Sequence, residues 1–105
     1  VNELFQFLRK HGNREERLVD RLLFSAMIEA RSCERFKLLT EEVEDPELRT
    51  FYNDLMVSEA GHYATFIGFA RKHGGRVDVD ARWKAFLAYE AEVIARYGTK
   101  ATMHG

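Results

Sequence analysis

The chain has 105 residues, of which 46% are hydrophobic and 31% charged, a composition typical of one small folded domain. Its formal net charge of -1 gives no overall attraction for polyanions, so any contact with nucleic acid must come from a local basic patch. The single cysteine, Cys33, excludes an intramolecular disulfide and a cysteine-based zinc cluster. We therefore expect a cytoplasmic protein.

The sequence begins at Val1 rather than at a methionine, and we expect it to be a segment of a longer protein. It contains no basic-then-apolar leader, and no apolar run approaches the roughly 20 residues that a bilayer requires. We expect neither a targeting signal nor contact with a membrane.

Turn and capping signals predict a short first helix that ends at His11-Gly12, followed by a long helix over residues 13–43. Asn13 followed by Glu16 three residues later is an N-cap signal for the long helix. Apolar residues recur every three or four positions along it and predict one buried stripe, made of Leu18, Leu22, Ala26, Ala30 and Cys33 with Val19, Leu23 and Phe36 beside them.

A second long helix is predicted over residues 46–73, with Asp45 as its N-cap and Pro46 at its first position. Cations precede Gly74 at its end, as is favourable for the helix dipole. Its inner stripe consists of Leu48, Tyr52, Leu55, Met56, Glu59, His62, Tyr63 and Phe66. The two long helices are expected to form an antiparallel hairpin.

A further helix is predicted over residues 80–97, with Asp78 or Asp80 as its cap and Gly98 as its end. The tail over residues 99–105 shows no regular pattern, and no segment alternates as a strand does. We predict an all-α helical bundle in a single domain over residues 1–105, built as one long antiparallel hairpin with flanking helices.

Glu59 and His62 are three residues apart, so their side chains share one helix face, and that face is apolar. A carboxylate among apolar residues is unfavourable unless something compensates its charge, and a metal ion does so efficiently. Glu29 lies on the stripe of the partner helix, with the turn near Asp45 roughly midway between it and Glu59. A Glu-x-x-His from one helix and a lone Glu from the other make up half the ligand set of a di-iron carboxylate site.

Two other glutamates leave alternatives open. Glu34 is five residues from Glu29 and is turned from it by about 140° around the helix, so both cannot point to one centre. Glu29 is more central in the stripe, which leaves Glu34 as an alternative ligand or as a group that supports the ligands. Glu90 occupies an inward position and is either a buried hydrogen-bonding partner or part of the site.

Several runs resemble the bacterial tRNA hydroxylases that oxidise the isopentenyl group of methylthio-isopentenyl-adenosine beside the anticodon. The resemblance covers most of the chain and rests on residues 28–36 (IEARSCERF), Phe51-Tyr52, residues 58–63 (SEAGHY), residues 89–94 (YEAEVI) and Met103-His104-Gly105. Gly61 departs from the family pattern, in which an arginine is usual, and we expect this to affect contacts with RNA or with the groups around the ligands.

The resemblance implies a ferritin-like four-helix bundle whose two hairpins each supply a Glu and a Glu-x-x-His to two non-haem iron ions. Dioxygen would be the co-substrate, tRNA the substrate, and an unidentified electron donor a further partner. The chain resembles only the C-terminal half, with Glu29, Glu59 and His62 as metal ligands and catalytic residues. Either the missing N-terminal half or a second copy in a homodimer would complete the site.

Two other classes of protein compete with this interpretation. One is a ferritin-like protein that binds iron or oxidises another substrate without RNA, and the other is a metal-free helical assembly module. Arg31, Arg35 and a cluster formed by Arg71, Lys72 and Arg76 are candidates for contacts with tRNA phosphates. Solvated helix faces are the simpler interpretation of these cations.

Overall fold

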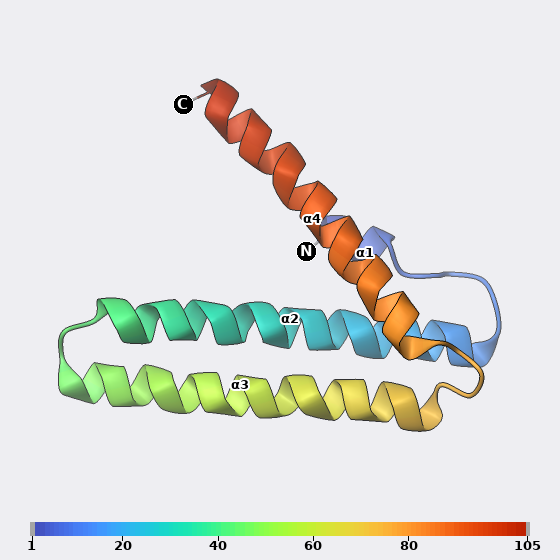
Figure 1. Cartoon of the computed structure of the whole chain (residues 1–105), viewed down its shortest axis with the longest axis horizontal. Helices are drawn as coiled ribbons and strands as arrows, with labels where there is room; N and C mark the ends of the chain where they lie inside the picture. The colour runs from blue at the N-terminus through green and yellow to red at the C-terminus, as the bar shows by residue number, and fades with distance from the viewer. Residues whose placement is uncertain (1, 105) are drawn as a thin grey trace.

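The computed structural model describes the backbone of residues 2–104 and the side chains of residues 3–97. Figure 1 shows its helices in chain order, which are α1 (Asn2–Gln6), α2 (Arg14–Glu42), α3 (Pro46–His73) and α4 (Val79–His104). Residues 2–104 contain no strand, so the predicted all-α class is confirmed. None of the helices in this part of the chain combines the length and the apolar character needed to cross a membrane.

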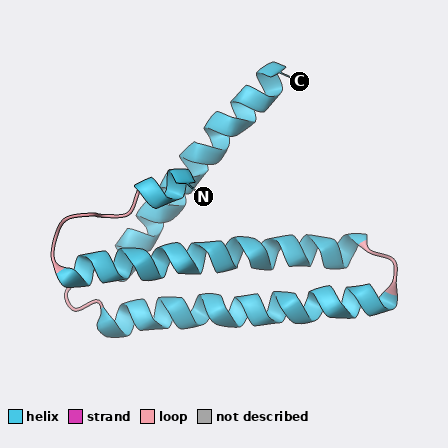
Figure 2. Ribbon diagram, turned by 180° about the vertical axis from the view of Figure 1, so that it is seen from behind, coloured by secondary structure: helices cyan, strands magenta, loops and turns pink. Residues whose placement is uncertain are grey.

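The helices α2 and α3 form the predicted antiparallel hairpin, which is visible in both Figure 1 and Figure 2. At the start of α2, the Asn13 side chain accepts a hydrogen bond from the Glu16 amide at 2.8 Å, and the Glu16 carboxylate accepts one from the Asn13 amide at 3.1 Å. At the start of α3, the Asp45 carboxylate accepts from the amides of Glu47 and Leu48. These side chains satisfy amides that have no partner within the helix, which is why each helix begins where it does.

Two adjacent glycines end α3 for different reasons. A Cβ atom on Gly74 would lie 2.8 Å from the Val19 side chain and 2.5 Å from the Ala70 carbonyl oxygen, so the close approach of α2 excludes a larger residue. Gly75 has a φ angle of 59°, in the left-handed region that glycine adopts without strain. The chain then turns into α4, whose first turn is capped by Asp78 through the Ala81 amide at 3.0 Å.

The two flanking helices differ from the prediction at their ends. α1 stops at Gln6 rather than at Gly12, because Phe7 leaves the helix and packs between α4 side chains, stacked on Tyr89 at 4.6 Å. α4 continues through Gly98 to His104, so Gly98 does not end it. A glycine inside a helix is unfavourable by only about 1 kcal/mol relative to alanine, and the flanking residues are compatible with a helix.

The core lies at one end of the hairpin, where α4 and α1 pack against the start of α2 and the end of α3 (Figure 1). Its buried residues are Val19, Leu23, Ala26, Met27, Ile67, Ala70, Val79 and Phe86. No residue between positions 28 and 66 is buried, and the molecule is thin, with extents of 49 × 38 × 18 Å. Most of the hairpin is therefore a single layer of two helices.

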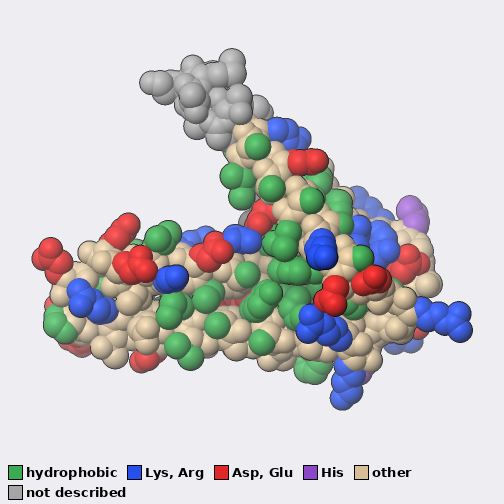
Figure 3. Space-filling model, viewed as in Figure 1, with side chains coloured by type: hydrophobic (Ala, Val, Ile, Leu, Met, Phe, Trp, Pro, Cys, Tyr) green, Lys and Arg blue, Asp and Glu red, His purple; other side chains and the backbone are tan. Residues whose placement is uncertain are grey.

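Exposed apolar side chains follow from this thin shape. Leu18 and Leu48, which were predicted to lie in the buried stripes, are exposed in the structure. Ile94 and Tyr97 are exposed as well, because α4 projects away from the hairpin (Figure 1). On the face shown in Figure 3, apolar side chains also run along the hairpin beyond α4. The prediction of apolar stripes was right, but the expectation that each stripe is buried was wrong for Leu18 and Leu48.

Candidate metal site

The structure brings Glu29 of α2 together with Glu59 and His62 of α3, midway along the hairpin. One ligand atom from each of the three residues lies within 4.8 Å of the others. His62 Nδ1 is 3.7 Å from a carboxylate oxygen of Glu29 and 4.0 Å from one of Glu59. The antiparallel pairing of the helices and the three-residue spacing on α3 produce this convergence.

The cluster opens to solvent on the side of the hairpin away from α4. The side chains of Glu29 and Glu59 are 24% and 20% exposed, whereas that of His62 is 57% exposed. Arg31 is two residues from Glu29 and therefore points to nearly the opposite side of α2, where its guanidinium donates to Glu90 of α4 at 2.7 Å. The face that carries the cluster is thus not covered by α4.

The charges of the cluster are not balanced by a permanent cation. Within the described side chains, neither Glu29 nor Glu59 forms an ion pair with a lysine or an arginine, and His62 is their one possible cationic neighbour. Two converging carboxylates repel each other unless a cation or a proton lies between them. The donor set is therefore one that a positive ion would stabilise.

The three residues fit a transition-metal ion by chemistry and by distance. Carboxylate oxygen and imidazole nitrogen are the donors that iron and similar divalent ions accept. Two donors that each lie about 2.1 Å from one ion are at most about 4.2 Å apart. The two separations from His62 Nδ1, 3.7 and 4.0 Å, fall within that limit, whereas the three ligand atoms together lie within the wider distance of 4.8 Å. Glu29, Glu59 and His62 could therefore hold one ion together after small side-chain rotations.

Glu34 and Glu90, the two alternatives from the sequence, lie apart from this cluster, and both pair with Arg31. The Arg31 guanidinium contacts Glu34 at 2.6 Å and Glu90 at 2.7 Å, and Glu90 is buried whereas the Glu34 side chain is 64% exposed. Partial burial by itself lowers the pKa of Arg31, but the Glu34 hydrogen bond and the charge of Glu90 outweigh it and raise that pKa. Arg31 therefore ties α4 to α2 on the far side from the cluster.

A second charged group, which the sequence analysis missed, is centred on Asp20. Its carboxylate is fully buried and accepts hydrogen bonds from the Arg9 amide at 2.7 Å and from the guanidinium groups of Arg9 and Arg82. Burial alone raises the pKa of Asp20, but the hydrogen bonds from Arg82 and Arg9 outweigh it and lower that pKa below its ordinary value. The group joins the segment after α1, α2 and α4, so its role is structural.

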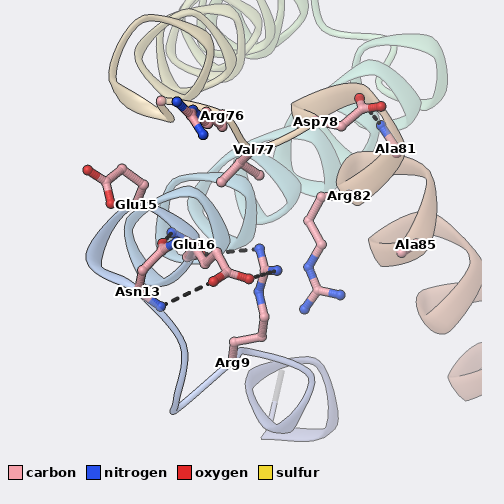
Figure 4. Close-up of a pocket in the computed structure, with 11 residues that line it drawn as sticks. Arg9, Asn13, Glu15, Glu16, Arg76, Val77, Asp78, Ala81, Arg82 and Ala85 are labelled. Atoms are coloured by element: carbon pink, nitrogen blue, oxygen red, sulfur yellow. Dashed lines mark hydrogen bonds and ion pairs between the residues drawn. The ribbon is translucent and has the colours of Figure 1, made fainter.

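A cleft of about 670 Å³ lies beside this group, between the starts of α2 and α4 and the end of α3. Figure 4 shows that Arg9 and Arg82 extend into the same region from different elements, with Glu16 beside Arg9. Their charges are already satisfied by Asp20 and Glu16. Glu16 is 13 residues from Glu29, or about 20 Å along the helix, so the cleft is separate from the carboxylate and histidine cluster.

The fold and the cluster together define a class of protein, namely a helical hairpin whose carboxylate and histidine cluster matches one half of the ligand set of a di-iron carboxylate site. The chain belongs to the tRNA-(MS2IO6A)-hydroxylase (MiaE) family, whose model matches residues 2–105. The resemblance seen in the sequence is thereby confirmed. No solved structure matches the chain.

Two curated relatives carry the name tRNA 2-(methylsulfanyl)-N(6)-isopentenyladenosine(37) hydroxylase. The one from Pseudomonas putida is 42% identical over 78 residues, which is 74% of this chain and 38% of the relative. The one from Salmonella typhimurium is 43% identical over 77 residues, which is 73% of this chain and 28% of the relative. The match thus spans well under half the length of either relative.

Gly61, the departure from the family pattern, lies on the outer side of α3. It is exposed, and no atom lies within 4 Å of the position that its Cβ would take. A longer side chain at this position would extend into solvent, away from α2. The space around position 61 would therefore accept a longer side chain without a clash at its Cβ.

Proposed function

We propose that this chain supplies half of the di-iron site of a cytoplasmic monooxygenase that hydroxylates the isopentenyl group of methylthio-isopentenyl-adenosine beside the anticodon of tRNA. The observation that carries the proposal is the convergence of Glu29, Glu59 and His62 within 4.8 Å in a member of this family. The names of the two relatives supply the substrate class and the type of reaction.

Each residue of the cluster has a distinct part in this proposal. Glu29 and Glu59 supply negative charge to the metal ions and can each reach more than one ion, because a carboxylate has two oxygens. His62 supplies a neutral nitrogen, and its Nδ1 atom is the one that faces both carboxylates. Leu55 and Phe66 precede and follow the ligands on the same face of α3 and are partly buried, so the surroundings suit an apolar prenyl chain.

The bound iron pair would supply activation of dioxygen, with one oxygen atom inserted into a C–H bond and the other released as water. The overall hydroxylation consumes two electrons and two protons for each dioxygen molecule, so an electron donor is a necessary partner. The residues of this chain bind and orient the ions. Exclusion of water requires a further element, since the side chain of His62 is 57% exposed.

Three donors are too few for two ions, so the proposal requires a second set of ligands. Either the N-terminal half of a longer protein or a second copy of this chain would bring another Glu and Glu-x-x-His to the open face. The relatives extend well beyond the matched segment, which leaves room for a second hairpin and supports the first option. The absence of buried residues between positions 28 and 66 supports a covering element of either kind.

The test is an assay of product and iron in the same preparations. Purified protein that contains both halves of the site, either the longer protein that includes this chain or a dimer of the chain, is loaded with ferrous iron. It is then given dioxygen, a reductant and tRNA that carries the methylthio-isopentenyl group, and the nucleosides are analysed by mass spectrometry. We expect the hydroxylated nucleoside from the parent and from Glu34→Gln, and none from Glu59→Ala. Iron binding without hydroxylation would favour an iron protein with another substrate, and protein without iron would favour a metal-free assembly module.

A further inference from the structure

Four arginines lie in one row along the outer edge of α2. Arg14, Arg17 and Arg21 are spaced by three and four residues, and Arg35 falls on the same side two heptads after Arg21. All four are exposed. Their guanidinium groups form no ion pair and no hydrogen bond with any side chain or carbonyl in the described part of the chain. We call these residues the arginine row.

The lack of partners distinguishes this row from most of the other arginines. Arg49 donates to the Val43 carbonyl, and within the described residues only Arg76, which lies outside the row, is likewise without an ion pair or hydrogen bond. Acidic partners lie within 4.0 Å of Arg9, Arg31, Arg71, Arg82 and Arg96. Within the row, Arg17 has like-charged neighbours three residues before it and four residues after it, and each such pair is unfavourable by about 0.2–0.5 kcal/mol. A polyanion laid along the row would remove this repulsion.

The row flanks the candidate metal site. Arg21 precedes Glu29 by eight residues and Arg35 follows it by six, which correspond to about 12 Å and 9 Å along the helix axis. Both are turned by roughly 80–120° from Glu29, toward the edge of α2 that faces away from α3. Cations thus lie on either side of the cluster, at distances that neighbouring phosphates of a nucleotide bound there can span.

The charge of the hairpin changes sign along its length. Residues 41–54, around the turn between α2 and α3, contain six acidic residues and one arginine. Acidic side chains gather at that end of the hairpin in Figure 3, and Lys and Arg side chains are more frequent at the other end. A polyanion would therefore be repelled by the turn and attracted along the row toward the start of α2.

We propose that the arginine row binds the phosphate backbone of the anticodon arm of tRNA and places the modified nucleotide beside the Glu29, Glu59 and His62 cluster. This inference rests on the proposed function for its choice of RNA. Ile28 is exposed within the row, between Arg21 and Arg35, and offers an apolar contact for a base or a prenyl group. The row supplies affinity and orientation, since phosphate contacts carry no sequence information.

The experiment compares two double variants that remove the same charge. Arg17→Gln with Arg21→Gln changes the row, whereas Lys37→Gln with Lys84→Gln removes two exposed lysines outside it. Binding of an unmodified anticodon stem-loop RNA is followed by fluorescence anisotropy at several salt concentrations. Circular dichroism checks that both variants keep the helical content of the parent.

We expect the row variant to raise Kd about tenfold at 0.1 M salt and to reduce the slope of log K against log salt by about 0.7–0.9 per arginine. The lysine control should change Kd less than twofold. Equal losses in both variants, or no binding of RNA by the parent, would overturn the inference. A row variant that changes its oligomeric state but still binds RNA would also overturn the inference. That result would mean that the row binds the acidic turn of a second copy.

The outcome is independent of the activity test. If the parent hydroxylates tRNA and both variants bind RNA equally well, the proposed role of the arginine row is refuted, whereas the proposed function is supported. If only the row variant loses RNA binding and the parent yields no hydroxylated nucleoside, RNA binding by the arginine row is supported and the proposed reaction is refuted.

Discussion

Two groups of charged side chains on α2 differ in how their charges are balanced. Asp20 is fully buried and is contacted by two arginines, so every charge in its surroundings has a partner. Glu29 and Glu59 are partly exposed and converge with only His62 between them. Loss of one partner from a closed, buried ion-pair network is destabilising, whereas an unbalanced pair of carboxylates is available to bind a cation. The balance of charge therefore distinguishes a structural ion-pair network from a candidate ligand site without reference to the family.

The largest expected effect on stability follows from removal of the Asp20 carboxylate. Asp20→Ala leaves the Arg9 and Arg82 guanidinium groups partly buried without their shared counter-charge. We expect a loss of about 3 kcal/mol in the free energy of unfolding, as is typical when one partner of a buried ion pair is removed. Urea denaturation measures this loss. A change below about 1 kcal/mol would mean that the network does not hold the helices together.

The same network predicts how stability depends on pH. The pKa of Asp20 is lower in the folded protein than its ordinary value, so its contribution is fully present above about pH 4. That contribution is lost as the pH falls through the lower pKa of the folded state. We expect the urea midpoint of the parent to drop below pH 4 more steeply than that of Asp20→Asn. Parallel curves for the two proteins would contradict this assignment.

A smaller effect is expected at the ion pair between α2 and α4. Glu90→Gln keeps the size of the buried side chain but removes its charge from the contact with Arg31. We expect a loss of about 1–2 kcal/mol, because Arg31 is partly exposed and water reduces the strength of the pair. Thermal unfolding by circular dichroism measures it. Iron binding should be unchanged, since Glu90 is not in the cluster, and a loss of iron would place Glu90 among the ligands.

The smallest effect on stability is expected at the open cluster itself. Glu59→Gln removes one of two converging carboxylates in the metal-free protein and therefore relieves repulsion. We expect the free energy of unfolding to stay within about 0.5 kcal/mol of the parent or to rise slightly, as is common where a site is built for function. A loss as large as that of Asp20→Ala would show that the cluster is structural and would erase the contrast between the two regions.

The sequence was sufficient to predict the hairpin and the three clustered residues. Asn13 with Glu16 and Asp45 with Pro46 are local signals for helix starts, and the spacing of Glu59 and His62 places them on one face whatever lies around them. The choice of Glu29 over Glu34 as the inward residue also agrees with their positions in the structure. Their binding of a metal stays a prediction.

The Asp20 network could not be predicted in the same way. Its partners Arg9 and Arg82 lie 11 and 62 residues away in the chain, and a single aspartate within an apolar pattern resembles a solvated position. The exposure of Leu18 and Leu48 could not be predicted from the hydrophobic periodicity either. Periodicity shows that a helix face is apolar but not whether another element covers it. Both failures concern contacts between elements distant in sequence.

The central claim is that Glu29, Glu59 and His62 bind iron, and the most direct measurement is the iron content of two histidine variants of α3. His62→Ala removes a proposed ligand, whereas His73→Ala removes an exposed histidine at the end of the same helix. Both variants are purified, loaded anaerobically with ferrous iron, desalted and analysed by mass spectrometry for metal. We expect stoichiometric iron in the parent and in His73→Ala, and its loss in His62→Ala. Equal iron in all three proteins would contradict the assignment of Glu29, Glu59 and His62 as ligands.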